Sequence, residues 1–144
     1  MLLIQERWKN KMKVIIVGGV AGGATAAARI RRLDEHAEIT VFERSGYISY
    51  ANCGLPYYIG DVITDPEELT LQTPESFFKR FHINMKIHHE VISIHPDRKT
   101  VSVKNLENGE IFEENYDKLI LSPGAKPTQP KIPGVGISKL FTLR

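Results

Sequence analysis

The sequence predicts an α/β fold in which a parallel sheet opens on a strand–helix–strand unit and carries an added antiparallel hairpin. Three observations lead to this prediction. A β-branched apolar run at residues 13–17 ends directly at a glycine-rich turn. A helix with very small residues on its inner face follows at residues 24–33, and a second apolar strand, residues 38–43, ends in an acid. This order is typical of a Rossmann-like, dinucleotide-binding βαβ unit.

The composition is that of an ordinary globular domain. The chain has 144 residues, of which 42% are hydrophobic and 25% charged, enough for one real core. A net charge of +2 gives no electrostatic argument for a nucleic-acid or membrane partner, and no apolar run is long enough to span a bilayer. A single cysteine fits a reducing cytoplasm, and the five histidines show no recognised metal spacing. We therefore expect a cytoplasmic protein without a metal site.

The glycine turn carries the first functional prediction. Gly18 lets the chain turn sharply out of the strand, and Gly23 lets the helix lie close to the sheet. Amide groups at the helix start would then face the pyrophosphate of a nucleotide cofactor. The middle glycine of the usual G-x-G-x-x-G pattern is Val20 here, so Gly19 or Gly22 must give the backbone room instead. A glycine turn that binds nothing is the structural alternative.

Glu43 supports the dinucleotide prediction. It lies twenty positions after Gly23, at the carboxyl end of the second strand. A carboxylate there accepts hydrogen bonds from a ribose with a free 2′-hydroxyl, which predicts FAD or NAD rather than NADP. The motif is compatible with both FAD and NAD.

The remaining elements follow from turn signals and apolar periodicity. Thr73-Pro74 predicts the start of a helix that runs through Phe81, and Asn108-Gly109 predicts a hairpin turn. Strands are expected at residues 83–87, 90–94, 100–103, 111–116 and 117–121. The last strand ends at the second glycine-containing turn, residues 122–125. A proline-rich extended connector follows, and residues 141–144 indicate the start of one more strand.

Cys53, the only cysteine, lies where an irregular segment is expected to become a short helix. Asn52 is the candidate N-cap, and Pro56 falls in the first turn. A thiol at a helix N-terminus is favoured in its thiolate form, which attacks disulfides and persulfides. An inert, buried cysteine is the alternative.

Four stretches of the chain resemble the N-terminal FAD-binding part of pyridine nucleotide-disulfide oxidoreductases, and more narrowly coenzyme A-disulfide reductases, including rhodanese-fused forms. They are VGGVAGGATAAARIRRL, VFERSGYISYANCGLPYYIG, YDKLILSPGAKP and IPG…LFTLR, and the likeness runs from Met12 to Arg144. The resemblance implies that FAD takes hydride from NAD(P)H and passes electrons to Cys53 in a homodimeric enzyme. Residues 13–144 would be a FAD-binding domain truncated before the NAD(P)H and dimerisation domains, with residues 1–12 as an N-terminal extension.

The resemblance also implies the site residues. Those matching cofactor-binding positions are Gly18, Val20, Ala21, Gly22, Gly23, Glu43, Arg44, Asn52, Cys53, Val91, Ser122, Pro123, Gly124 and Arg144. Those matching positions that meet coenzyme A, its disulfide or its persulfide are Thr25, Arg29, Arg32, Ser49 and Asn52. Arg29 and Arg32 share a helix face, and Arg31 points elsewhere. Lys79 and Arg80 are further candidates for CoA phosphates, although a solvated surface is the usual place for such arginines.

Two departures within the superfamily distinguish the possible reactions. Tyr58 stands where glutathione-reductase-like enzymes have a second cysteine, so Cys53 must form a mixed disulfide or be oxidised. Ala21 stands where lone-cysteine NADH oxidases and peroxidases carry a histidine, and alanine transfers no proton. Three hypotheses remain: part of a CoA-disulfide or CoA-persulfide reductase, part of an NADH oxidase or peroxidase, and a truncated nucleotide-binding module without catalysis.

Overall fold

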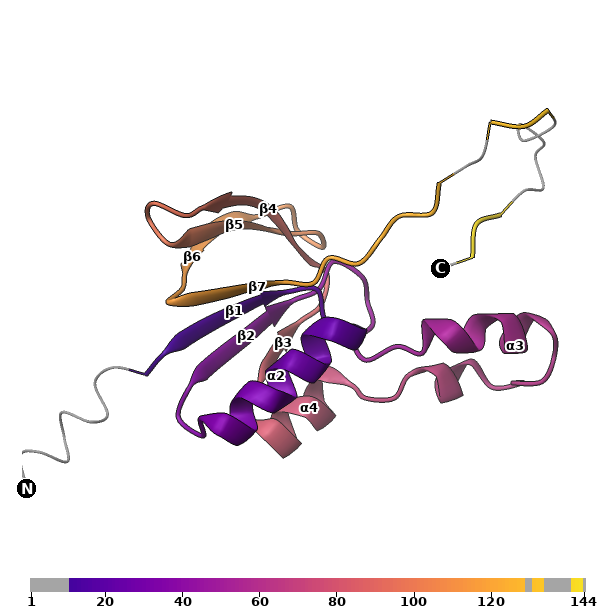
Figure 1. The fold of residues 1–144 in the computed structure, drawn as a ribbon, viewed down its shortest axis with the longest axis horizontal. Helices are drawn as coiled ribbons and strands as arrows, with labels where there is room; N and C mark the ends of the chain where they lie inside the picture. The colour runs from indigo at the N-terminus through magenta and orange to yellow at the C-terminus, as the bar shows by residue number, and fades with distance from the viewer. Residues whose placement is uncertain (1–10, 129–130, 134–140, 144) are drawn as a thin grey trace, which may run out of the picture.

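The protein folds into three layers (Figure 1). Residues 52–69 form an arm outside the layers, and the described residues that follow 121 also extend away from them. The computed structural model describes residues 11–128, 131–133 and 141–143. In chain order the elements are β1 (Lys13–Val17), α2 (Ala21–Leu33), β2 (Glu38–Phe42), the 3-10 turn η1 (Asn52–Gly54), α3 (Leu55–Ile59), the 3-10 turn η2 (Pro66–Leu69), α4 (Pro74–Phe81), β3 (Asn84–Lys86), β4 (His89–His95), β5 (Thr100–Asn105), β6 (Ile111–Asn115) and β7 (Lys118–Leu121).

Two sheets form the frame. The first is parallel, with strand order β3-β2-β1-β7, and the second is antiparallel, with order β4-β5-β6. The antiparallel sheet covers one face of the parallel sheet, and α2 and α4 cover the other (Figure 1). This arrangement confirms the predicted α/β class. The predicted hairpin is larger than expected, because β4 pairs with β5 and makes a three-stranded sheet.

The two cores follow from the alternation of side chains along β1. Val14 and Ile16 face the helices and pack in the core that contains Ala24 and Ala27 of α2. Ile15, between them, faces the other way and packs between the two sheets with Phe42 and the valines of β5. A strand buried on both faces reads as a continuous apolar run, which explains the sequence signal at residues 13–17.

The two helices that cover the sheet begin at residues whose types account for the local structure. α2 begins at Ala21, three residues earlier than predicted, so Gly22 and Gly23 lie in its first turn. A Cβ at Gly23 would collide with the Gly18 carbonyl oxygen, so only glycine allows this approach of helix to strand. α4 begins at Pro74 as predicted, and Thr73 and Ser76 form a reciprocal capping box.

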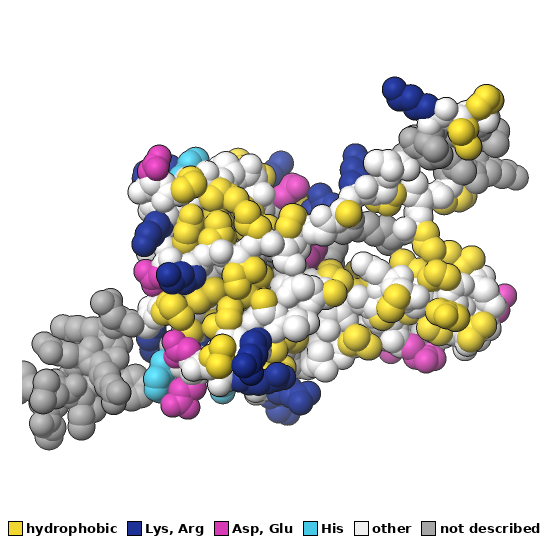
Figure 2. Space-filling view, in the orientation of Figure 1, with side chains coloured by type: hydrophobic (Ala, Val, Ile, Leu, Met, Phe, Trp, Pro, Cys, Tyr) yellow, Lys and Arg dark blue, Asp and Glu magenta, His cyan; other side chains and the backbone are white. Residues whose placement is uncertain are grey.

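The segment around Cys53 confirms the predicted short helix with Pro56 in its first turn, but not the predicted Asn52 cap. Residues 52–54 form the 3-10 turn η1, and α3 is only five residues long. Asn52 makes no side-chain capping bond, because it lies inside the turn and uses its backbone carbonyl to accept the Leu55 N–H. No residue of α3 is buried. Figure 1 shows α3 on an arm away from the layers, and Figure 2 shows hydrophobic side chains gathered over it.

The prediction of a C-terminal strand is wrong for the residues of it that the structure describes. Residues 141–143 have no regular secondary structure, and Arg144 lies outside the described residues. A strand needs a hydrogen-bonded neighbour, and these three residues pair with no strand among the described residues.

Arg31 joins the carboxyl ends of α2 and α4. Its Nε donates to the Phe81 carbonyl oxygen at 2.8 Å, and its Nη2 donates to the His82 carbonyl oxygen at 3.0 Å. Its Nη1 donates to the carbonyl oxygens of Asp34 at 3.2 Å and Glu35 at 2.8 Å. A guanidinium thus satisfies carbonyl groups that helix ends leave without partners. Arg31 points away from Arg29 and Arg32, as predicted, but it is not simply solvated.

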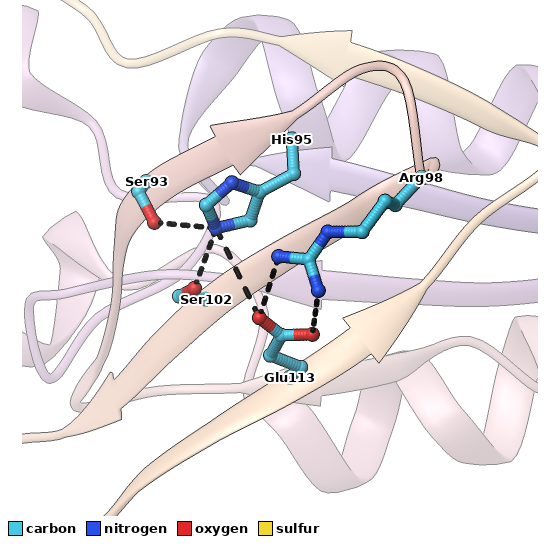
Figure 3. Close-up of polar contacts among 5 residues, drawn as sticks. All are labelled: Ser93, His95, Arg98, Ser102 and Glu113. Carbon is cyan, nitrogen blue, oxygen red and sulfur yellow. Dashed lines mark hydrogen bonds and ion pairs between the residues drawn. The ribbon is translucent and has the colours of Figure 1, made fainter.

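A polar cluster ties the three antiparallel strands together on their outer face (Figure 3). His95 Nε2 lies 3.1 Å from Ser93 Oγ and 3.0 Å from Ser102 Oγ. Arg98 donates to both carboxylate oxygens of Glu113, at 3.3 and 3.1 Å. The Arg98 and Glu113 side chains are 60% and 47% exposed, so water screens their attraction.

Replacing Arg31 with Ala is expected to lower the free energy of unfolding by about 2 kcal/mol, because several charge-assisted hydrogen bonds to carbonyls are lost. Arg98→Ala is the matched control and should cost less than about 1 kcal/mol, since it removes an exposed ion pair. Urea unfolding followed by circular dichroism measures both. Equal losses of unfolding free energy in the two variants would contradict the proposed role of Arg31 in joining the ends of α2 and α4.

Candidate functional site

The carboxyl ends of the parallel strands bring the predicted cofactor residues to one edge. Val17 pairs with Phe42 on one side and with Leu121 on the other. The residues that follow these strands, Gly18, Glu43 and Ser122, therefore lie next to one another. Gly18 has a φ of 94°, which allows the turn out of β1. In open α/β sheets this edge faces the ligand crevice.

A cavity of about 500 Å³ opens at this edge. The predicted residues that line it are Val20, Ala21, Gly22, Glu43, Arg44, Asn52, Ser122, Pro123 and Gly124. Ser45, Tyr47 and Tyr50 also line it and were not predicted. The rings of Tyr47 and Tyr50 pack with centroids 5.2 Å apart. The signal in the sequence that could have found them is a pair of tyrosines three positions apart, shortly after Glu43, the acidic residue that follows β2.

Gly22, rather than Gly19, gives the backbone room that the middle glycine of the motif gives in the usual pattern, where this chain has Val20. Gly22 lines the cavity, and a Cβ there would collide with Ser122 Oγ. Gly19 instead packs inward, where a Cβ would lie 3.1 Å from side-chain carbons of Glu43 and Ile48. Gly22 therefore provides the open backbone at the start of α2, where N–H groups attract anions.

Glu43 is the buried carboxylate of the site, with 8% of its surface exposed. Its Oε2 accepts a hydrogen bond from the Gly19 N–H at 2.7 Å, and its Oε1 accepts one from the Ser45 N–H at 2.8 Å. Each carboxylate oxygen can accept more than one hydrogen bond, so capacity remains for sugar hydroxyls. Glu43 thus holds the glycine loop in place, and its chemistry fits the ribose of a dinucleotide.

A smaller cavity, of about 130 Å³, continues the site towards β4. Two further predicted residues line it, Gly18 and Val91, and it shares Glu43, Arg44 and Pro123 with the larger cavity. His89 and Glu90 line it too and were not predicted. Of the other predicted cofactor residues, Gly23 is buried under the loop. Arg144 is outside the described residues.

Cys53 is exposed, and its neighbour Asn52 lines the larger cavity. The exposure excludes the inert buried alternative in this structure. The helix after Cys53 has only five residues, too few to provide the full dipole of a long helix. Activation of the thiol by a helix start, as expected from the sequence, therefore has little support in this geometry.

A third cavity, of about 410 Å³, brings together most of the predicted coenzyme A residues. Thr25, Arg29, Arg32 and Ser49 line it, along with Gln72 and Arg80. The described residues that line it include three arginines and no carboxylate. Figure 2 shows basic side chains gathered over the α2 and α4 region. Asn52, also predicted to meet coenzyme A, lies at the larger cavity instead.

Ser49 connects this arginine-lined cavity to the glycine loop. Its N–H donates to the Gly19 carbonyl oxygen at 3.0 Å, and its own carbonyl accepts the Leu71 N–H at 3.3 Å. Its backbone has a φ of 48°, a conformation that non-glycine residues adopt rarely. The surrounding hydrogen bonds hold it there, so the segment from Ser45 to Asn52 borders both cavities.

Comparison with known proteins shows which family has this sequence and fold. Residues 12–144 match the pyridine nucleotide-disulphide oxidoreductase family. The chain belongs to this family. Membership confirms the resemblance inferred from the sequence and the Rossmann-like α/β class. No helix in the described part of the chain is long and apolar enough to cross a membrane. The same residues contain no group of three or more His, Cys, Asp or Glu that could hold a metal ion.

Three members of the family illustrate the likeness. The coenzyme A disulfide reductase of Staphylococcus aureus is 54% identical over 113 residues, which cover 78% of this chain and 26% of that protein. The crystal structure of reduced Bacillus anthracis CoADR-RHD has a TM-score of 0.83 and 53% identity over 88% of this chain and 23% of the other. The water-forming NADH oxidase of Lactobacillus brevis has a TM-score of 0.80 and 38% identity over 89% of this chain and 28% of the other. The chain therefore spans about a quarter of these relatives.

Replacing Glu43 with Gln is expected to lower the free energy of unfolding by about 1–3 kcal/mol. A glutamine has one acceptor oxygen, so its amide group would face either the Gly19 N–H or the Ser45 N–H, both of which need an acceptor. Glu110→Gln, on an exposed residue, is the matched control and should have almost no effect. Denaturant unfolding of the two variants makes the comparison. An unchanged stability of Glu43→Gln would show that the carboxylate does not hold the loop.

Proposed function

We propose that this chain is the N-terminal FAD-binding portion of an NAD(P)H-dependent flavoprotein that reduces coenzyme A disulfide or coenzyme A persulfide through Cys53. The observation that carries the proposal is the segment from Ser45 to Cys53. Ser45, Tyr47, Tyr50 and Asn52 border the dinucleotide cavity, and Ser49 borders the arginine-lined cavity. In this proposal the exposed thiol of Cys53, next to Asn52 at the end of this segment, passes electrons from one ligand to the other.

The first ligand is FAD. Gly22 and the first turn of α2 would receive its pyrophosphate and Glu43 a ribose, and the turn at Ser122–Gly124, beside Gly22, would line the same site. When bound, FAD supplies the hydride-accepting and electron-passing chemistry that protein side chains lack. NAD(P)H is the reductant of the whole enzyme. In this proposal residues 13–144 are part of the FAD-binding domain of a cytoplasmic homodimer, and residues 1–12 are an extension.

The second ligand is coenzyme A, which is strongly anionic. Arg29, Arg32 and Arg80 provide three guanidinium groups in one cavity, and guanidinium is well suited to phosphate recognition. Thr25 and Ser49 add hydroxyl groups at the same cavity. The names of two relatives support this choice, because the S. aureus protein is a coenzyme A disulfide reductase and the B. anthracis structure is of CoADR-RHD.

An NADH oxidase or peroxidase is the competing function, and the L. brevis relative is a water-forming NADH oxidase. Ala21 counts against it. Ala21 lines the dinucleotide cavity at the position where the sequence comparison expects the histidine of such enzymes, and it has no group to give or accept a proton. The higher identity to the coenzyme A disulfide reductase, 54% compared with 38%, points the same way.

The chemical step at Cys53 is thiol–disulfide exchange. The Cys53 thiolate attacks one sulfur of coenzyme A disulfide and forms a new S–S bond, while the old S–S bond breaks and its electron pair leaves with coenzyme A thiolate. The leaving thiolate then takes a proton from water. Because Cys53 is the only cysteine, no second thiol of this chain resolves the mixed disulfide. The adduct therefore persists until electrons arrive from outside.

Incubating the chain with coenzyme A disulfide is expected to add one coenzyme A per chain, detected by intact mass spectrometry, and Cys53→Ser should abolish the adduct. Arg32→Ala should slow its formation about tenfold, because it removes a phosphate-binding charge. A neutral disulfide should react equally fast with the unchanged chain and with Arg32→Ala. Arg98→Ala, far from the cavity on the antiparallel sheet, is the control. Equal rates for Arg32→Ala and the unchanged chain would argue against this cavity as the coenzyme A site.

FAD is expected to bind the chain weakly and to give a yellow preparation with flavin absorbance, because the chain spans about a quarter of its relatives' length. Steady consumption of NADH with coenzyme A disulfide should be absent for the same reason. Absorbance at the NADH band, followed with and without added FAD, makes the measurement. Sustained turnover by the 144-residue chain would overturn this expectation, and a chain that never takes up flavin would support a non-catalytic module.

A further inference from the structure

The smaller cavity has a definite place along a bound dinucleotide. Glu43 and Arg44 border both cavities, so the smaller one begins where the ribose-binding carboxylate stands. A nucleotide runs in the order pyrophosphate, ribose, base. With the pyrophosphate at the start of α2 and the ribose on Glu43, the base comes to the next space, which Val91, His89 and Glu90 border.

The His89 ring has a defined orientation. Its Nδ1 lies 2.6 Å from the Ile87 carbonyl oxygen, and a carbonyl oxygen only accepts hydrogen bonds, so Nδ1 carries the proton. The ring also packs against Phe42 and Phe112, with centroids 6.3 and 6.1 Å away. In the neutral ring Nε2 is therefore a bare acceptor, and its position is held by the hydrogen bond and by the two aromatic neighbours.

A hydrogen-bond acceptor at this cavity would distinguish adenine from hypoxanthine. Adenine carries an amino group, which donates, where hypoxanthine carries a carbonyl oxygen, which accepts. Glu43 and Glu90 also bring carboxylates to the cavity. Both Glu43 oxygens already accept backbone N–H groups. The Glu90 carboxylate is 41% exposed and lies 4.0 Å from Arg44 Nη1, so it is better placed to pair with that cation. His89 is thus the more suitable group for reading the base edge.

We propose that His89 is a specificity-determining residue for the cofactor: its Nε2 accepts a hydrogen bond from the exocyclic amino group of adenine. The inference rests on the proposed function, because it takes the dinucleotide to be FAD. It adds a residue that selects the base, whereas Glu43 and the glycine loop recognise only sugar and phosphates.

The first test changes the ligand and leaves the protein intact. The chain is titrated with FAD and with the analogue in which hypoxanthine replaces adenine, and binding is followed by flavin fluorescence. We expect FAD to bind about five to ten times more tightly, the factor that a hydrogen bond of ordinary strength gives. Equal affinities would overturn the inference about His89.

The second test changes the protein. His89→Leu should weaken FAD binding by the same factor and leave the hypoxanthine analogue bound as tightly as FAD. His89→Gln, whose amide can donate or accept, should bind both ligands with similar affinity. His36→Leu, which replaces an exposed histidine beside Glu35, should keep the preference of the unchanged chain. Thermal unfolding of each variant, followed by circular dichroism, shows whether the fold survives.

The two proposals fail in different ways. If neither dinucleotide binds, the proposed FAD function fails and the role of His89 fails with it. If both dinucleotides bind equally to the unchanged chain, the FAD function stands and only the base-selecting role is overturned. If the preference exists but survives in a folded His89→Leu variant, another group reads the base and the assignment to His89 is wrong.

Discussion

The close approach of α2 to β1 is the constraint on which the other features depend. The Gly18 carbonyl oxygen occupies the space that a side chain at Gly23 would need. Because Gly23 lacks a Cβ, the helix settles against the sheet on Ala24 and Ala27. The first turn of α2 then points its free N–H groups over the carboxyl edge of the sheet, and the dinucleotide cavity forms there.

Because α2 has 3.6 residues per turn, it directs three groups of residues to three different sides. Its first turn borders the dinucleotide cavity through Gly22. Arg29 and Arg32, one turn apart, face the arginine-lined cavity. Arg31 faces the opposite way and binds carbonyl groups at the end of α4. That contact keeps α4 beside α2, which brings Arg80 to the cavity where the other two arginines lie.

The segment that carries Cys53 is much more exposed than the packed sheets and helices. Cys53 is exposed, and the short helix that follows it buries none of its residues. Large apolar side chains on this arm, including Tyr57, Ile59 and Val62, are exposed to more than half of their possible area. Under the proposed function, the packed sheets and helices position the ligands, whereas the exposed arm carries the thiol. In our proposal the reactivity of Cys53 therefore depends on the bound dinucleotide and coenzyme A more than on the helix beside it.

The sequence by itself determined the βαβ unit, the positions of the strands and the family. Local signals are sufficient for these: a continuous apolar run for a buried strand, glycines where a Cβ would collide, and an acid at a strand end. It failed at Asn52, because a 3-10 turn and an N-cap share the same residue preferences, and at residues 141–143, because a strand needs a partner. Only the tertiary structure brought Arg80 to Arg29 and Arg32, gave Arg31 its carbonyl partners and placed His89 beside Glu43. These contacts join residues that are distant in the chain, and no local pattern in the sequence encodes such distances.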